Sequence, residues 1–119
     1  MKLTLNKTDR LKSKKAITQL FEEGKSFKKF PLRVLYLPME NANKTKAGFS
    51  VPKRLFKLAV DRNRIKRQLR EAYRQNKASL EKETDTKFIL MFIFVGREDL
   101  PYAQIEKAVL GLLKQLKQA

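Results

Sequence analysis

The run Phe88–Val95, FILMFIFV, constrains the fold of this chain more than any other segment. Every residue in it is apolar, so a strand formed here is hydrophobic on both faces and needs packed elements on both of them. A run of this length is far too short to cross a bilayer. It therefore predicts the central strand of a small sheet that is covered on each side.

The segments before this run predict a short helix and two strands. Ser13 is a suitable N-cap, apolar residues follow it at helical spacing, and Gly24 ends the pattern. Phe30–Leu37 alternates between two faces, and Ala47–Val51 is a second short strand. The turn-rich stretch Pro38–Lys46 connects them, so we expect the two strands to form an antiparallel hairpin.

Two further helices are expected around the apolar run. The first begins near Asp61 and ends around residues 76–77, before a charged loop, and the second lies at the C-terminal end. The apolar stripe of that last helix consists of Ile105, Val109, Leu112, Leu113 and Leu116. The order α-β-β-α-β-α predicts an α+β sandwich, a single domain with about three helices on a small mixed sheet. We expect this domain to span residues 1–119, with a basic N-terminal arm at 1–12.

The helix expected over Val60–Arg74 carries the strongest functional signal. Plotted at about 100° per residue, it has an apolar stripe made of Ile65, Leu69, Ala72 and Tyr73. A ridge at four-residue spacing runs beside the stripe and consists of Arg62, Lys66, Arg70 and Arg74. Like charges at this spacing destabilise a helix, so we expect the ridge to face a polyanion. Lys53, Arg54 and Lys57 add charge just before the helix, where backbone N–H groups also favour phosphate.

The charge balance indicates the class of polyanion and limits the chemistry. The chain has 28 Lys and Arg against 12 Asp and Glu, a formal net charge of +16, which favours nucleic acid. It contains neither His nor Cys, so disulfides, Cys/His zinc sites and His-activated nucleophiles are excluded. No secretory signal follows Met1, and we expect a cytoplasmic protein that binds no membrane.

RNA is favoured over DNA, because no short helix and tight turn of the helix-turn-helix kind precede the basic helix. Single-stranded RNA is held by a basic groove and by aromatic rings on which bases stack. Tyr36 is the strand residue that we expect to hold such a ring at the surface. Two other functions stay open. One is a small ribosomal-type or general RNA-binding protein without a role in cleavage, and the other is a stand-alone nuclease in which Asp61, Glu71 or Asp85 holds magnesium.

The run Gly48–Arg74, GFSVPKRLFKLAVDRNRIKRQLREAYR, resembles the signature region of the bacterial ribonuclease P protein subunit. The core of that signature is Arg62-Asn63-Arg64, continued by Ile65-Lys66-Arg67 and a spaced Arg70. It follows a Gly-x-Ser-Val strand and a basic pair, here Gly48, Ser50, Val51, Lys53 and Arg54. Leu20-Phe21 and Gly24 also fit, so the similarity extends weakly over nearly the whole chain.

The resemblance implies a subunit of an RNA-based endoribonuclease. In this family the catalytic RNA, with bound Mg²⁺, removes the 5′ leader from precursor tRNA, and the protein performs no bond chemistry. The implied partners are ribonuclease P RNA and precursor tRNA, with no DNA. No catalytic or metal-ligating residue is expected in the chain itself. The family fold further implies a left-handed crossover between parallel strands, against the usual right-handed rule.

Carried over by position, the family's functional residues form two groups. The residues expected to contact the catalytic RNA are Lys53, Arg54, Arg62, Asn63, Arg64, Lys66, Arg67 and Arg70. The residues expected to meet the leader, in a cleft between the first helix and the sheet, are Phe21, Tyr36 and Ser50. The chain departs from the family pattern at Ile17, where a second aromatic residue is common. It also departs in Leu55–Ala59, which is one residue longer than usual, and at Asp61, whose negative charge directly precedes Arg62.

Overall fold

The computed structural model describes residues 11, 13–39, 44–98 and 100–118 and confirms the α+β fold class. Three helices and a four-stranded mixed sheet follow one another in the order α-β-β-β-α-β-α. The helices are α1 (Lys14–Glu23), α2 (Ala59–Glu83) and α3 (Tyr102–Lys117), and the strands are β1 (Lys25–Lys29), β2 (Leu32–Met39), β3 (Lys46–Ser50) and β4 (Lys87–Phe94).

The sheet is arranged around β4, as the apolar run predicts. Its strand order is β1-β2-β4-β3, with β4 antiparallel to β2 and parallel to β3. The predicted hairpin between β2 and β3 is therefore wrong, because β4 lies between them. The doubly apolar β4 gains most from the central position, where both neighbours and both faces bury it. β3 reaches β4 through α2, and this parallel βαβ unit is where the family resemblance implies the left-handed crossover.

The hairpin that does exist joins β1 to β2, and its first strand is not predicted from the sequence. Lys25 lies opposite Tyr36, and Lys29 lies opposite Leu32. In β1 only Phe27 is partly buried, and its other residues are exposed. A strand so basic has no alternation of apolar and polar residues to reveal it.

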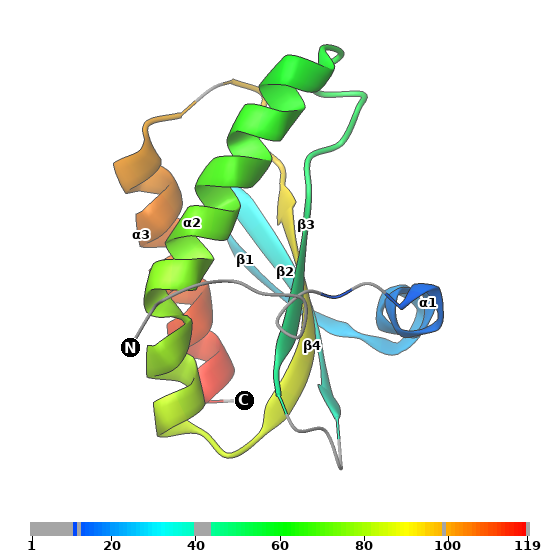
Figure 1. Ribbon diagram of the computed structural model, residues 1–119, viewed down its shortest axis with the longest axis vertical. Coiled ribbons are helices and arrows are strands. Elements are labelled where there is room, and N and C mark those ends of the chain that lie inside the picture. Colours follow the sequence, from blue (N-terminus) through cyan, green and yellow to red (C-terminus); the bar gives the residue numbers. More distant parts are fainter. Residues whose placement is uncertain (1–10, 12, 40–43, 99, 119) are drawn as a thin grey trace.

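Each face of β4 belongs to a different core. Phe88, Leu90, Phe92 and Phe94 point into the larger core with α2 and α3, while Ile89 and Met91 point toward α1. Figure 1 shows α2 and α3 together on one side of the sheet and α1 alone on the other. Both faces of the central strand are thus covered, as expected.

The helix ends follow their local chemistry. The Ser13 side chain accepts a hydrogen bond from Ala16 N at 3.2 Å, and Gly24 N donates to Leu20 O at 2.8 Å, so the predicted limits of α1 are confirmed. α2 runs six residues past the predicted end at Lys77, to Glu83. Its apolar stripe continues through the buried Leu80, and Lys117 Nζ of α3 contacts Glu83 Oε2 at 3.0 Å. Both the burial of Leu80 and the ion pair of Glu83 arise from the tertiary structure. The charged sequence of this segment therefore does not predict that the helix continues.

The expected N-terminal arm lies outside the described residues apart from Leu11. Leu11 N donates to Ala47 O at 3.0 Å, and its buried side chain packs in the core under α1. No helix in the described part of the chain is long and apolar enough to cross a membrane.

Candidate nucleic-acid interface

The predicted basic ridge lies along the outer surface of α2. The stripe that faces the core, made of Ile65, Leu69, Ala72 and Tyr73, is buried as expected. The helix has 25 residues, which gives it a length of about 37 Å. Asn63, Arg67 and Arg70 are exposed, and Arg62, Arg64 and Lys66 are half-buried beside the stripe.

Two acidic side chains of α2 neutralise part of its charge. Asp61 Oδ1 lies 3.3 Å from Arg64 Nη2, and Glu71 forms a two-point ion pair with Arg74. Hydrogen bonds from Arg74 and then Gln75 lower the pKa of Glu71 from 4.5 to about 2, so its charge persists at neutral pH. The positive charge of Arg74 is therefore balanced by the carboxylate of Glu71.

Three basic side chains on this face of α2, the ridge residues Lys66 and Arg70 and the adjacent Arg67, are not neutralised by any acid in the described part of the chain. Within the described residues, Lys66, Arg67 and Arg70 make no side-chain hydrogen bond or ion pair. Their spacing of three and four residues puts them on neighbouring turns of one helix face. Such a cluster is suited to a run of phosphates.

The basic loop between β3 and α2 is held in a fixed shape by Arg62. Leu55 N donates to Pro52 O at 3.1 Å, which closes a turn around the exposed Lys53 and Arg54. Arg62 Nη1 donates to both Phe56 O and Lys57 O, each at 2.8 Å. The first arginine of the Arg-Asn-Arg core thus links the loop to the first turns of α2.

On the opposite side of the sheet, four residues form a strip across all four strands. Lys28 lies opposite Arg33, Arg33 opposite Ile93, and Ile93 opposite Ser50. All four share the α1 side of the sheet, where Lys28 and Arg33 are exposed and Ile93 and Ser50 half-buried. Four strands span about 14 Å at the usual strand spacing. The strip runs directly from β3 into the basic loop at Lys53.

Comparison with known proteins agrees with the signature in the sequence. The family model described as Ribonuclease P matches residues 5–117. The ribonuclease P protein component of Porphyromonas gingivalis is 39% identical over 110 residues, which cover 88% of this chain and 80% of the relative. The chain belongs to the ribonuclease P protein family. It is therefore a subunit of ribonuclease P, an RNA-catalysed endoribonuclease, and its partner is ribonuclease P RNA.

Other members of the ribonuclease P protein family show the same relationship. The protein component of Streptococcus pneumoniae serotype 4 is 36% identical over 118 residues, 95% of this chain and 88% of the relative. The solved ribonuclease P protein of Thermotoga maritima superposes with a TM-score of 0.73 at 25% identity, covering 89% of this chain and 96% of that one. The solved protein of Staphylococcus aureus shares the fold, with a TM-score of 0.77 at 24% identity and coverage of 92% and 95%.

The predicted leader residues of this ribonuclease P protein lie in three different surroundings. Phe21 is 56% exposed on α1, and Ser50 belongs to the strip. The expectation that Tyr36 holds its ring at the surface is wrong, because Tyr36 is only 7% exposed and points toward α2 and α3. Its ring stacks on Phe27 at a centroid distance of 4.7 Å and meets Phe88 edge-on at 6.1 Å.

Lys28 and Arg33, at the α1 side of the sheet, are candidate site residues that were not predicted from the sequence. The alternation of β2 carried the signal, since it places Arg33 with Leu35 and Leu37 on the face opposite Tyr36. Lys28 could be found only after β1 was recognised as the partner of β2.

The carboxylates proposed for a stand-alone nuclease are not brought together. Asp61 and Glu71 each pair with an arginine and lie about 15 Å apart along the helix axis. Asp85 is exposed beyond the end of α2. Among the residues that the structure describes, no group of three His, Cys, Asp or Glu side chains is close enough to hold a metal ion.

Proposed function

We propose that the protein binds ribonuclease P RNA through the ridge of α2 and the basic loop before it. The observation that supports this most directly is a set of three cationic side chains, Lys66, Arg67 and Arg70, that have no acidic partner among the described residues. Lys53 and Arg54 extend this surface beyond the helix N-terminus, while Asn63 and Arg64 lie on the polar side of the same turns. Arg62 holds the loop and acts on the RNA through it.

We further propose that the 5′ leader of precursor tRNA follows the strip on the other side of the sheet. The cationic Lys28 and Arg33 meet its phosphates, Ser50 offers a hydroxyl, and Phe21 offers an exposed ring for stacking. Because the strip ends at the basic loop, one continuous surface joins the leader to the catalytic RNA. Tyr36 has no direct part in this path, since its ring is buried on the other face.

The Mg²⁺ that cleavage requires is then bound mainly by the RNA, and the chain contributes positive charge. A net charge of +16 reduces the repulsion between substrate and catalytic RNA that metal ions must otherwise screen. The protein assists removal of the leader in the cytoplasm as one domain, residues 1–119, without making or breaking a bond itself.

The RNA-binding surface is tested by the salt dependence of affinity for ribonuclease P RNA. Arg67→Ala and Arg70→Ala are each expected to lower the slope of log K against log salt by roughly 0.7–0.9, the value of one phosphate contact. Lys114→Ala, an exposed charge on α3, is the matched control and leaves the slope unchanged. Equal slopes for the wild type and both arginine variants would refute the assignment of the ridge.

The leader path is tested by comparing precursor and mature tRNA in the assembled enzyme. Arg33→Ala is expected to weaken binding of precursor tRNA and to leave mature tRNA unaffected, because only the precursor carries a leader. Lys114→Ala again serves as the control for lost charge. An equal loss for both tRNAs would count against the strip.

A further inference from the structure

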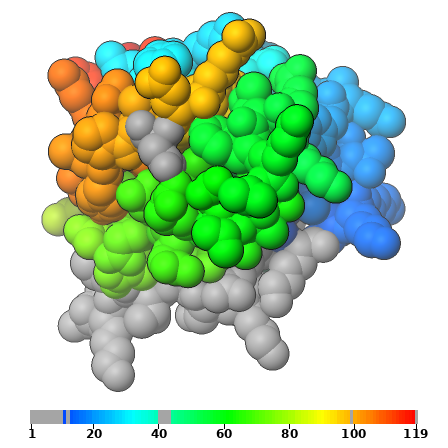
Figure 2. Space-filling view, turned by 90° about the horizontal axis from the view of Figure 1, so that it is seen from above, coloured from blue at the N-terminus to red at the C-terminus, as the bar shows by residue number. Residues whose placement is uncertain are grey.

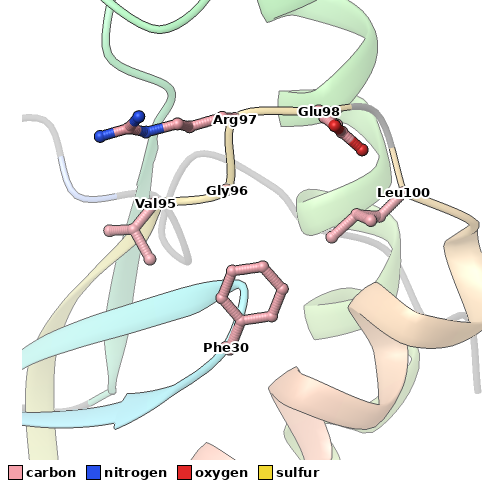
Figure 3. A pocket seen from close by; sticks show the side chains of 6 residues that line it. All are labelled: Phe30, Val95, Gly96, Arg97, Glu98 and Leu100. Atoms are coloured by element: carbon pink, nitrogen blue, oxygen red, sulfur yellow. The ribbon is translucent and has the colours of Figure 1, made fainter.

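A surface cavity of about 330 Å³ lies at the end of the sheet where α2 begins, outside both surfaces proposed above. It is lined by Phe30, Val95, Gly96, Arg97, Glu98 and Leu100. Figure 3 shows the Phe30 ring standing between the segment after β4 and Leu100. Its described lining residues therefore combine apolar walls with one side chain of each charge, which is typical of a small-ligand site.

The cavity walls are fixed by the fold. Val95 N donates to Pro31 O at 2.8 Å, which ties the β1–β2 turn to the end of β4. Gly96 packs so closely that an added Cβ would lie 3.1 Å from the Phe94 ring and 3.2 Å from Pro31. Phe30, in contrast, is 66% exposed. A large ring held at the surface beside a rigid wall offers a flat apolar face to a planar ligand.

The charged side chains of the cavity point in different directions. In Figure 3, the Arg97 side chain extends past Val95 and away from Glu98. The Glu98 carboxylate points toward Leu100. A phosphate is repelled by Glu98 and attracted by Arg97, so a strand can pass only with its backbone on the Arg97 side. The group that then faces Phe30 and Glu98 is a base.

The basic loop lies next to the cavity. Phe56 of that loop packs against Phe94 with ring centroids 5.7 Å apart. The Phe94 ring also packs against Gly96. Figure 2, a view onto this end of the molecule, shows the loop and the first turns of α2 (green) beside the segment after β4 (gold). An RNA bound by Lys53 and Arg54 thus has its neighbouring nucleotides within reach of the cavity.

We propose that this cavity binds one unpaired base of an RNA, stacked on Phe30 with its edge toward Glu98 and its phosphate beside Arg97. The inference rests on the proposed function for the class of ligand and adds a base-binding site to it. A carboxylate accepts hydrogen bonds only, so it favours a base with two adjacent donors. Guanine has such a pair on its Watson–Crick edge and uracil does not, so the site favours guanine.

A single tryptophan can report the stack, since the chain has none of its own. Phe30→Trp is titrated with a single-stranded pentanucleotide of uridines with or without a central guanosine. Stacking is expected to quench the indole fluorescence, at lower concentration for the guanosine oligonucleotide. Leu110→Trp, at a 45% exposed position on α3, is the matched control and stays unquenched. Equal quenching of both tryptophans, or none at position 30, would overturn the assignment.

Two further variants separate the ring from the carboxylate. Phe30→Ala is expected to weaken binding of the guanosine oligonucleotide at least about fivefold, the low end for a base–aromatic stack. Glu98→Gln is expected to abolish the preference for guanosine over uridine and to leave binding of the uridine oligonucleotide no weaker. Wild-type affinity for Phe30→Ala, with an unchanged melting temperature, would overturn the stack. A retained guanosine preference in Glu98→Gln would overturn the role of the carboxylate.

The source of the base is decided with the full RNAs. A loss of affinity of Phe30→Ala for ribonuclease P RNA assigns the base to the catalytic RNA, and a loss only in the assembled enzyme's affinity for precursor tRNA assigns it to the substrate. If Phe30→Ala binds both RNAs with wild-type affinity, the cavity proposal alone is overturned. The ridge is tested separately, by the loss of affinity expected for Arg70→Ala. If the wild-type protein binds neither RNA, the proposed function fails as well.

Discussion

Arg62 has a structural contact that the signature in the sequence does not predict. The resemblance predicts that this first arginine of the signature contacts RNA, and its Nη1 group also donates to the carbonyls of Phe56 and Lys57, each at 2.8 Å. Arg62→Ala removes both bonds and releases the loop that carries Lys53 and Arg54. We therefore expect a loss of stability, together with an effect on RNA that exceeds one phosphate contact.

The size of the stability loss follows from these two bonds. A hydrogen bond to a charged group contributes about 1.5–3 kcal/mol, and partial exposure of this pair reduces each to about 1 kcal/mol. Together they give about 2 kcal/mol. For a domain of this size that corresponds to a fall of about 8 °C in melting temperature.

Thermal unfolding of Arg62→Ala and Arg70→Ala provides the comparison. The exposed Arg70 makes no side-chain hydrogen bond or ion pair within the described residues, so its removal changes stability by less than about 0.5 kcal/mol. In RNA binding, Arg62→Ala is expected to lower the salt slope by more than Arg70→Ala, because the charges of the loop lose their positions. An unchanged melting temperature for Arg62→Ala, or a slope change equal to that of Arg70→Ala, would refute the role of Arg62 as a positioning residue.

Four other substitutions, one of them a control, test the packing and the Glu71–Arg74 ion pair. Tyr36→Ala is expected to cost about 3–5 kcal/mol in urea unfolding, as for other buried aromatic residues; a small loss would contradict its burial. Gly24→Ala places a Cβ 2.3 Å from Leu20 O and is expected to cost about 1–3 kcal/mol. Gly111→Ala, whose Cβ has the flexible Lys29 side chain as its nearest neighbour, is the control and stabilises α3 by up to about 1 kcal/mol. Because the pKa of Glu71 is lowered to about 2, its contribution to stability is present above pH 4.5 and lost as the pH falls toward 2. The stability difference between the wild type and Glu71→Gln, measured by thermal melts across this pH range, should therefore vanish at the acid end.

The elements that could be predicted from sequence are those whose signal is local. The cap at Ser13, the end at Gly24 and the apolar stripes of α2 and α3 follow from chemistry within a few residues. The pairing of strands does not, because β2 and β3 are neighbours along the chain but are separated by β4 in the sheet. β1 was missed because its sequence, KSFKK, has only one residue that faces the core.

In the candidate site, too, only the features with a local signal could be predicted from the sequence. The ridge was visible because helical periodicity fixes which side chains share a face. The Arg62 bonds to Phe56 and Lys57 depend on the path of a loop, which periodicity does not describe. Tyr36 was misplaced by an argument about residue type, although the alternation of β2 already put it on the face of Leu32 and Val34.

The most direct test of the proposed function is cleavage of precursor tRNA by ribonuclease P RNA at low Mg²⁺, with and without the protein. We expect cleavage at the mature 5′ end to depend on the wild-type protein. A variant with Lys66, Arg67 and Arg70 replaced by alanine should fold but fail to stimulate cleavage. RNA binding by the wild-type protein without stimulation, or full stimulation by the triple variant, would contradict the proposal that this ridge joins the protein to the catalytic RNA.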